Sequence, residues 1–94
     1  MTDLEPAIAV VKTAIAQYDG AGGCRDAADY DAWKARRDAA GRIAEGMLGK
    51  AGATIHHGSE TRLSFAGIRA SSTQGLSMCL AHWLMTARQR QAAL

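Results

Sequence analysis

The chain has 94 residues, of which 48% are hydrophobic and 21% charged, and its formal net charge is +2 at pH 7. This length accommodates one small domain, residues 1–94, and excludes a second hydrophobic core. No apolar run approaches the roughly 18 residues of a membrane-spanning helix, and the acidic start lacks the features of a signal peptide, so we expect a cytoplasmic protein without membrane contact.

Two helices are predicted in the N-terminal part. The first carries one apolar seam at steps of four and three residues: Leu4, Ile8, Val11, Ile15 and Tyr18. The glycine-rich segment 19–23 ends it. The second helix is expected from about Asp26 or Asp29 to about Gly49, and its large apolar residues are Tyr30, Trp33, Ile43, Met47 and Leu48.

A β-hairpin is predicted next. Residues 53–57 and 61–65 alternate in polarity, and the stretch 57–60 between them has the composition of a turn. Ile55, Leu63 and Phe65 can share a buried face. The other face would then present Thr54, His56, Arg62 and Ser64 to water. The segment from 65 to 72 reads as a linker to the next helix.

The last helix has the strongest apolar stripe of the chain: Leu76, Cys79, Leu80, Trp83, Leu84 and Ala87. The predicted fold is therefore α+β, with two N-terminal helices, a two-stranded antiparallel hairpin and a C-terminal amphipathic helix, in the order ααββα. We expect Trp33 and Trp83 to fill its centre.

No catalytic or metal-binding group can be read from the sequence. Cys24 precedes a predicted helix, which lowers a thiol pKa, but nothing places a general base beside it. His56 and His57 would point to opposite faces of a strand, and Cys79 with His82 makes only two ligands. The two cysteines are expected to be reduced thiols, with a disulfide between them as the alternative. The sequence predicts a non-enzymatic protein without metal or cofactor.

Charge is distributed unevenly along the chain. Residues 1–31 contain two basic and six acidic residues, a net charge of −4, whereas residues 32–94 contain nine basic and three acidic residues, a net charge of +6. Such a division is typical of separate acidic and basic surfaces, and equally of ordinary solvated faces. The candidate partner-binding residues are Lys34, Arg36, Arg37, Arg42, His56, Arg62 and Arg69.

Residues 53–92 resemble the small phage head-to-tail joining proteins of the lambda W type. The matching pattern is Ala53-Thr54-Ile55, a polar turn, Arg62-Leu63-Ser64-Phe65, and Ser71-Ser72-Thr73 before an amphipathic helix. The resemblance implies a helix, hairpin, helix order and a non-enzymatic part of a larger assembly. It transfers no functional residues, and the linker before Ser72 is longer here.

Two functions are expected from these observations. The first is a protein–protein interaction module, encoded by a phage or mobile element, that acts as an assembly component or as a small inhibitor or adaptor. Its partner is another protein or a second copy of the chain, because an alanine-rich core of this size gains stability from association. The alternative is nucleic-acid binding through the basic residues of the second helix.

Overall fold

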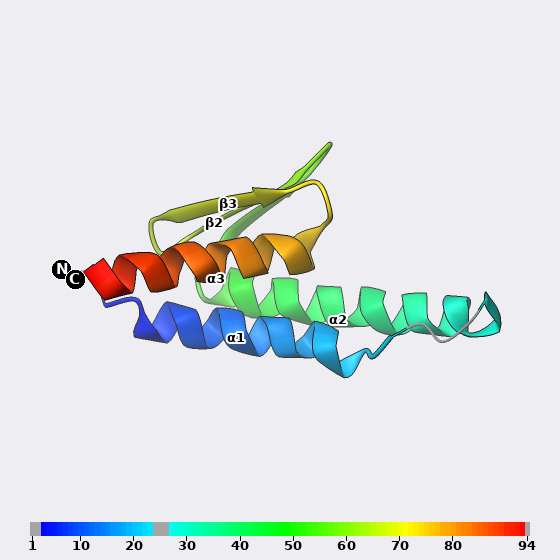
Figure 1. Ribbon diagram of the computed structural model, residues 1–94. Coiled ribbons are helices and arrows are strands. Elements are labelled where there is room, and N and C mark those ends of the chain that lie inside the picture. Colours follow the sequence, from blue (N-terminus) through cyan, green and yellow to red (C-terminus); the bar gives the residue numbers. More distant parts are fainter. Residues whose placement is uncertain (1–2, 24–26, 94) are drawn as a thin grey trace.

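The computed structural model of the protein describes residues 3–23 and 27–93 and confirms the α+β class. Its elements in chain order are α1 (Glu5–Gly20), the short 3-10 helix η1 (Ala27–Asp29), α2 (Tyr30–Lys50), β1 (Thr54–His57), β2 (Thr61–Phe65), β3 (Ile68–Ser72) and α3 (Leu76–Ala93). The strands form one antiparallel sheet in the order β1-β2-β3. One face of the sheet lies on α3, and α1 packs against α3 and α2 (Figure 1).

The sheet has three strands, so the prediction of a two-stranded hairpin and the order ααββα is wrong. The segment expected to be a linker contains β3, which pairs with β2 from Phe65↔Ile68 onward. Ala66 and Gly67 make the connection with φ angles of 52° and 76°. Positive φ at both central residues is the geometry of the tightest β-hairpin turn, so the chain reverses at once instead of leaving the sheet. The resemblance implies a two-stranded hairpin between helices, whereas this sheet has a third strand.

The two serines that stand before the last helix in the pattern of the resemblance belong to the sheet. Ser71 and Ser72 lie in β3, and the helix begins only at Leu76. The Ser72 hydroxyl accepts a hydrogen bond from the backbone N–H of Gln74, 3.0 Å away. It therefore stabilises the turn between strand and helix.

The core lies between the sheet, α3, α1 and the C-terminal half of α2. Its largest fully buried side chains are Trp83, Leu48, Leu63, Ile68, Leu80, Val11 and Cys79. Trp83 stacks on Phe65 with a centroid distance of 5.5 Å, and its indole N–H donates to the Phe65 carbonyl at 3.0 Å. The helical seams predicted for α1 and α3 thus face the core, with Ile15, Tyr18 and Leu84 half-buried at its margin.

Trp33 does not fill the centre, in contrast to the prediction. The helix α2 extends beyond the rest of the molecule (Figure 1), whose principal extents are 50 × 25 × 22 Å. Its buried residues, Ala40, Ala44 and Leu48, all lie in its second half. Trp33 lies in the first half and is only half-buried. We call η1, residues 30–37 and the described loop residues 21–23 the tip.

Within residues 3–23 and 27–93, no helix combines the length and the apolarity needed to cross a bilayer.

Candidate interaction surfaces

The face of the sheet that points away from α3 is covered by no helix in the described ranges. Its side chains form two rows across the strands, Thr54–Ser64–Arg69 and His56–Arg62–Ser71. All six are exposed, whereas their neighbours Leu63 and Phe65 on the other face are buried. We call these six residues the outer sheet face.

Two guanidinium groups give the outer sheet face its chemistry. Arg62 Nε donates to Glu60 Oε1 at 2.9 Å, and this pair is exposed. Arg69, on the neighbouring strand, takes part in no ion pair among the described residues. Together with the hydroxyl groups and Glu60, they line a shallow groove. Guanidinium groups flanked by hydroxyls suit carboxylate or phosphate groups.

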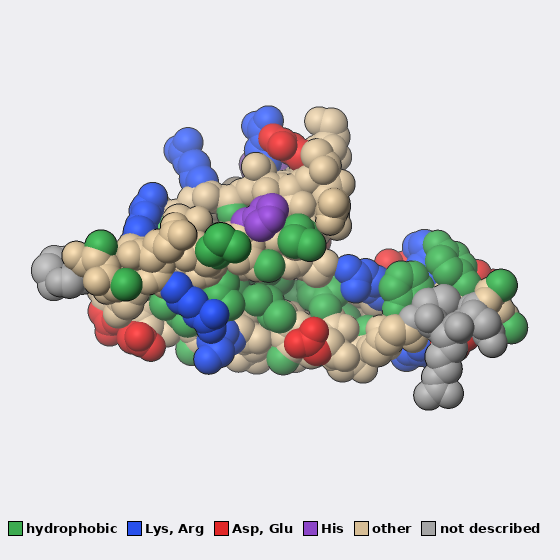
Figure 2. Space-filling model, in the orientation of Figure 1, with side chains coloured by type: hydrophobic (Ala, Val, Ile, Leu, Met, Phe, Trp, Pro, Cys, Tyr) green, Lys and Arg blue, Asp and Glu red, His purple; other side chains and the backbone are tan. Residues whose placement is uncertain are grey.

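The structure therefore brings together three of the residues singled out in the sequence, His56, Arg62 and Arg69. Alternation along the strands was sufficient to predict that His56 and Arg62 share a face. The position of Arg69 beside them depends on β3, which the sequence analysis treated as a linker. Lys and Arg side chains stand out from the sheet at the top of the molecule in Figure 2.

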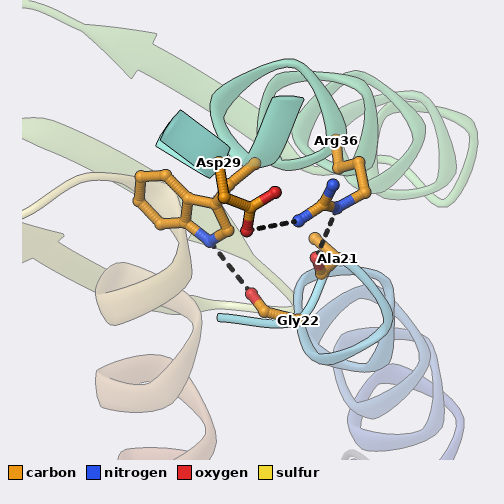
Figure 3. A network of polar contacts seen from close by, with 5 residues as sticks. Ala21, Gly22, Asp29 and Arg36 are labelled. Carbon is orange, nitrogen blue, oxygen red and sulfur yellow. Dashed lines mark hydrogen bonds and ion pairs between the residues drawn. The ribbon is translucent and has the colours of Figure 1, made fainter. Parts of the chain in front are cut away.

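The four basic candidates of the second helix lie elsewhere. Lys34 pairs with Asp38 one turn along α2, with Nζ and Oδ2 3.0 Å apart. Arg36 holds the tip together: its Nε donates to the Ala21 carbonyl at 3.0 Å, and one of its terminal nitrogens lies 3.7 Å from Asp29 Oδ2 (Figure 3). In the same network the Trp33 indole N–H donates to the Gly22 carbonyl at 3.0 Å.

Arg37 links three elements of the fold. It donates to the Ser77 hydroxyl at 2.7 Å, and its guanidinium lies over the rings of Tyr18 and Trp33, 5.1 and 5.8 Å from their centroids. Arg42 is exposed and makes none of the ion pairs found in the described chain. None of the four lines the groove of the outer sheet face.

The histidines and the described cysteine occupy separate environments. His57 pairs with Glu45 of α2, and His82 Nδ1 donates to the Ser71 carbonyl at 3.0 Å. Cys79 is buried and its thiol lies 3.4 Å from the Ala70 carbonyl. Burial raises the pKa of the Cys79 thiol, which disfavours the reactive thiolate. Cys24 lies outside the described residues.

No metal site is formed by the residues whose positions are described. Groups of three or more His, Cys, Asp or Glu side chains in ligating arrangement are absent among them. In particular, Cys79 faces the core while His82 is at the surface, so the two do not point to one ion.

A second surface was missed in the sequence. A groove runs between α1 and α3, and three adjoining hollows that share residues make up its length. Its floor is apolar, with Ile15, Ala81, Leu84 and Met85, and Met78 lies toward one end. Figure 2 shows the hydrophobic side chains gathered between the two helices. We call this surface the α1–α3 groove.

A second apolar stripe in the sequence of α3 indicates this groove. Met78, Ala81, Met85 and Ala92 recur at steps of three, four and seven beside the core stripe. A helix with two apolar stripes has more apolar surface than one core can cover. Met78 and Met85 of this second stripe are 39% and 60% exposed, so the core does not cover them.

Comparison of the chain with protein-family models, with curated proteins and with solved structures finds no match.

Proposed function

We propose that this protein is a non-enzymatic protein–protein interaction module whose outer sheet face binds an acidic segment of a partner protein. One observation carries the proposal. Arg62 and Arg69 lie in adjacent rows on a sheet face that no described helix covers, with hydroxyl groups beside them. An arginine fork recognises a carboxylate through two parallel hydrogen bonds, and neighbouring hydroxyls complete the set of donors.

A protein partner fits this face better than a nucleic acid does. The six side chains of the outer sheet face include no Phe, Tyr or Trp, and His56 has the one ring among them on which a base would stack. Glu60 also neutralises part of the charge of Arg62, whereas phosphate backbones select dense positive charge. The outer sheet face instead combines arginines and hydroxyl groups with the neighbouring Glu60, and such a mixture matches the polar rim typical of protein interfaces.

The alternative, nucleic-acid binding through α2, depends on Lys34, Arg36, Arg37 and Arg42. Three of these four side chains already make intramolecular contacts. The alternative would therefore require the tip contacts to be exchanged for phosphate contacts.

The resemblance of residues 53–92 to phage head-to-tail joining proteins supports the first reading. It favours a phage or mobile-element protein that acts as an assembly component, and a small inhibitor or adaptor has the same requirement for an open binding face.

Nuclear magnetic resonance titration of the isotope-labelled full chain tests the proposal. The probes are a peptide of alternating Glu and Ser residues and a single-stranded oligonucleotide of equal net charge. The peptide is expected to shift the amide signals of β1, β2 and β3. Arg69→Glu should weaken its binding at least about tenfold, because it replaces an attraction with a repulsion.

Arg42→Glu is the matched control, since it makes the same charge change on α2 and should leave peptide binding unchanged. A peptide that shifts no sheet signal would overturn the proposal. Oligonucleotide binding that weakens steeply with salt and is lost in Arg42→Glu would establish the alternative instead.

A further inference from the structure

We infer that the hollow at the start of α3 binds a phosphate group, either as free phosphate or as the monoester of a small molecule. The hollow has a volume of about 430 Å³ and lies between α2, the hairpin of β1 and β2, and the segment that leads from β3 into α3 (Figure 1). None of the six residues of the outer sheet face lines it. The inference is therefore independent of the proposed function.

The first turn of α3, which lines the hollow, has unpaired backbone donors. The first hydrogen bond of the helix runs from the Cys79 N–H to the Gly75 carbonyl at 3.2 Å. The N–H groups of Leu76, Ser77 and Met78 therefore have no acceptor within the helix, and the described residues supply none from outside it. Gly75 has no side chain to cap them, and the first turn contains no acidic residue. The positive end of the helix dipole thus has no acidic partner in its own turn.

A nearly buried hydroxyl group from the sheet faces the same hollow. Thr61 is only 7% exposed and lies opposite Ser72, at the end of β3 from which the chain turns into α3. Its hydroxyl makes no hydrogen bond with the described residues. Every fully enclosed side-chain nitrogen or oxygen in that part of the chain has a partner, so the unpaired Thr61 oxygen opens into the hollow that the residue lines. Hydroxyls buried to this extent are seldom left unpaired, and an oxyanion would accept the hydrogen bond.

Arg37 adds a positive charge beside the start of the helix. Its half-buried guanidinium donates to the Ser77 hydroxyl at 2.7 Å. Arg37 takes part in no ion pair among the described residues, and neither a hydroxyl nor an aromatic ring cancels its charge. Because Ser77 accepts from Arg37, its own O–H remains available as a donor. A guanidinium, hydroxyl groups and the N–H groups of a helix start are the donors that hold a phosphate group in proteins.

Two carboxylates also line the hollow, and each is paired with a basic side chain. Asp38 lies 3.0 Å from the Nζ atom of Lys34, and Glu45 pairs with His57. Arg42 lines the hollow as well and makes none of the ion pairs of the described chain. The charges of the hollow that lack an ion-pair partner are therefore those of two arginines, and both are positive.

A phosphate group fits these donors better than a carboxylate does. A carboxylate is planar and is satisfied by one arginine fork. The donors of the hollow come from α2, α3 and the sheet, and a tetrahedral oxyanion can accept from several directions at once. The volume of the hollow is that of a small-molecule site and exceeds the volume of one phosphate group. The remaining space would accommodate the group that a monoester carries.

Nuclear magnetic resonance titration of the full chain with inorganic phosphate tests the inference, with the ionic strength held constant by sodium chloride. Phosphate should shift the amide signals of Leu76, Ser77 and Met78 and reach saturation. Ethyl phosphate is the second probe and distinguishes the two sources of the group. Binding at least as tight as that of phosphate would identify a monoester as the ligand, and weaker binding would identify free phosphate.

Ser77→Asp is the most informative variant because it places a carboxylate at the start of the helix, beside Arg37. It should raise the melting temperature and weaken phosphate binding at least about tenfold, since the carboxylate takes the place of the ligand. Thr61→Val keeps the shape of the side chain without the hydroxyl and should weaken binding about fivefold. Ser59→Asp makes the same change as Ser77→Asp at an exposed turn residue and should leave phosphate binding unchanged.

Two results would overturn the inference. One is a titration in which phosphate shifts no signal at the start of α3, or no more than an equal ionic strength of chloride does. The other is undiminished phosphate binding by Ser77→Asp, which would place the phosphate elsewhere. Ser77→Asp should still bind the acidic peptide through the outer sheet face, so a failure of this inference is distinguishable from a failure of the proposed function.

Discussion

The tip and the rest of the described molecule, which we call the body, are stabilised by different means. In the body, Trp83 is fully buried, stacks on Phe65 and donates to a backbone carbonyl. In the tip, Trp33 is half-buried, lies 5.8 Å from the ring of exposed Tyr30 and donates to a loop carbonyl. The tip contains one buried residue, Ala21, and polar contacts connect its parts.

The difference shows that a tryptophan in an amphipathic helix pattern does not by itself specify a buried position. A helix that extends beyond its neighbours keeps its periodicity but loses the surface against which the apolar stripe would pack. Hydrophobic stabilisation scales with the area removed from water, so the body holds most of the folding free energy. The tip is held by contacts of about 1 kcal/mol each.

The largest expected effect is that of Trp83→Ala. The substitution leaves a cavity in the core and the Phe65 carbonyl without its donor, and we expect a loss of about 3–5 kcal/mol in the free energy of unfolding. Urea unfolding followed by circular dichroism measures it. A loss below that of the matched tip variant Trp33→Ala would contradict the distinction between body and tip.

Trp33→Ala is the second prediction. It removes the hydrogen bond to Gly22 and one ring under Arg37, and the expected loss is about 1–2 kcal/mol. Hydrogen exchange should rise at the amides of residues 30–37 and stay slow at the centre of α3. Equal acceleration in α3 would show that tip and body unfold as one unit.

Two glycines of α2 give a smaller effect of opposite sign. A Cβ at Gly46 meets nothing within 4 Å, so Gly46→Ala should stabilise the protein by about 0.5–1 kcal/mol through helix propensity. A Cβ at Gly41 would lie 3.0 Å from the Tyr18 hydroxyl. Gly41→Ala should therefore gain less than Gly46→Ala, and a larger gain in thermal unfolding would argue against close contact at this junction.

The smallest effect is a dependence of stability on alkaline pH. Burial raises the pKa of Cys79 above its ordinary value of 9.0, so above pH 9 the unfolded chain loses the thiol proton more readily. Stability should then fall as the pH rises. The pKa of Tyr18 is also raised, first by burial and then by Glu45, and it adds a fall that begins above 10.0.

Chemical unfolding at a series of pH values measures this slope. Cys79→Ala should flatten it from about pH 9 upward, whereas Tyr18→Phe should flatten it chiefly around and above pH 10. A slope that persists in Cys79→Ala would assign the effect to another group.

The sequence predicts the helices and the first two strands because each has a clear period. The stripe of α3 and the alternation of residues 61–65 are repeated often enough to identify one buried face. The third strand was not predicted since Ala66-Gly67 is a weak turn signal: alanine rarely adopts the positive φ that it has here. The reason lies in the pairing of β3 with β2, which requires a two-residue turn with positive φ at Ala66.

The candidate surfaces were predicted to a different extent. Strand alternation places His56 and Arg62 together without any tertiary information. The roles of Arg36 and Arg37, by contrast, depend on where the loop and Ser77 lie, and no local pattern specifies such distant contacts. The exposure of Met85 likewise depends on how α1 packs against α3, which the period of α3 alone does not specify.

The hydrogen bond from His82 to the Ser71 carbonyl has a consequence for aggregation. β3 is the last strand of the sheet, and its outer edge would otherwise offer that carbonyl to a strand from another molecule. The imidazole occupies the acceptor, so an incoming strand must displace it before pairing can begin. Growth by strand addition is thereby hindered at this edge of the sheet.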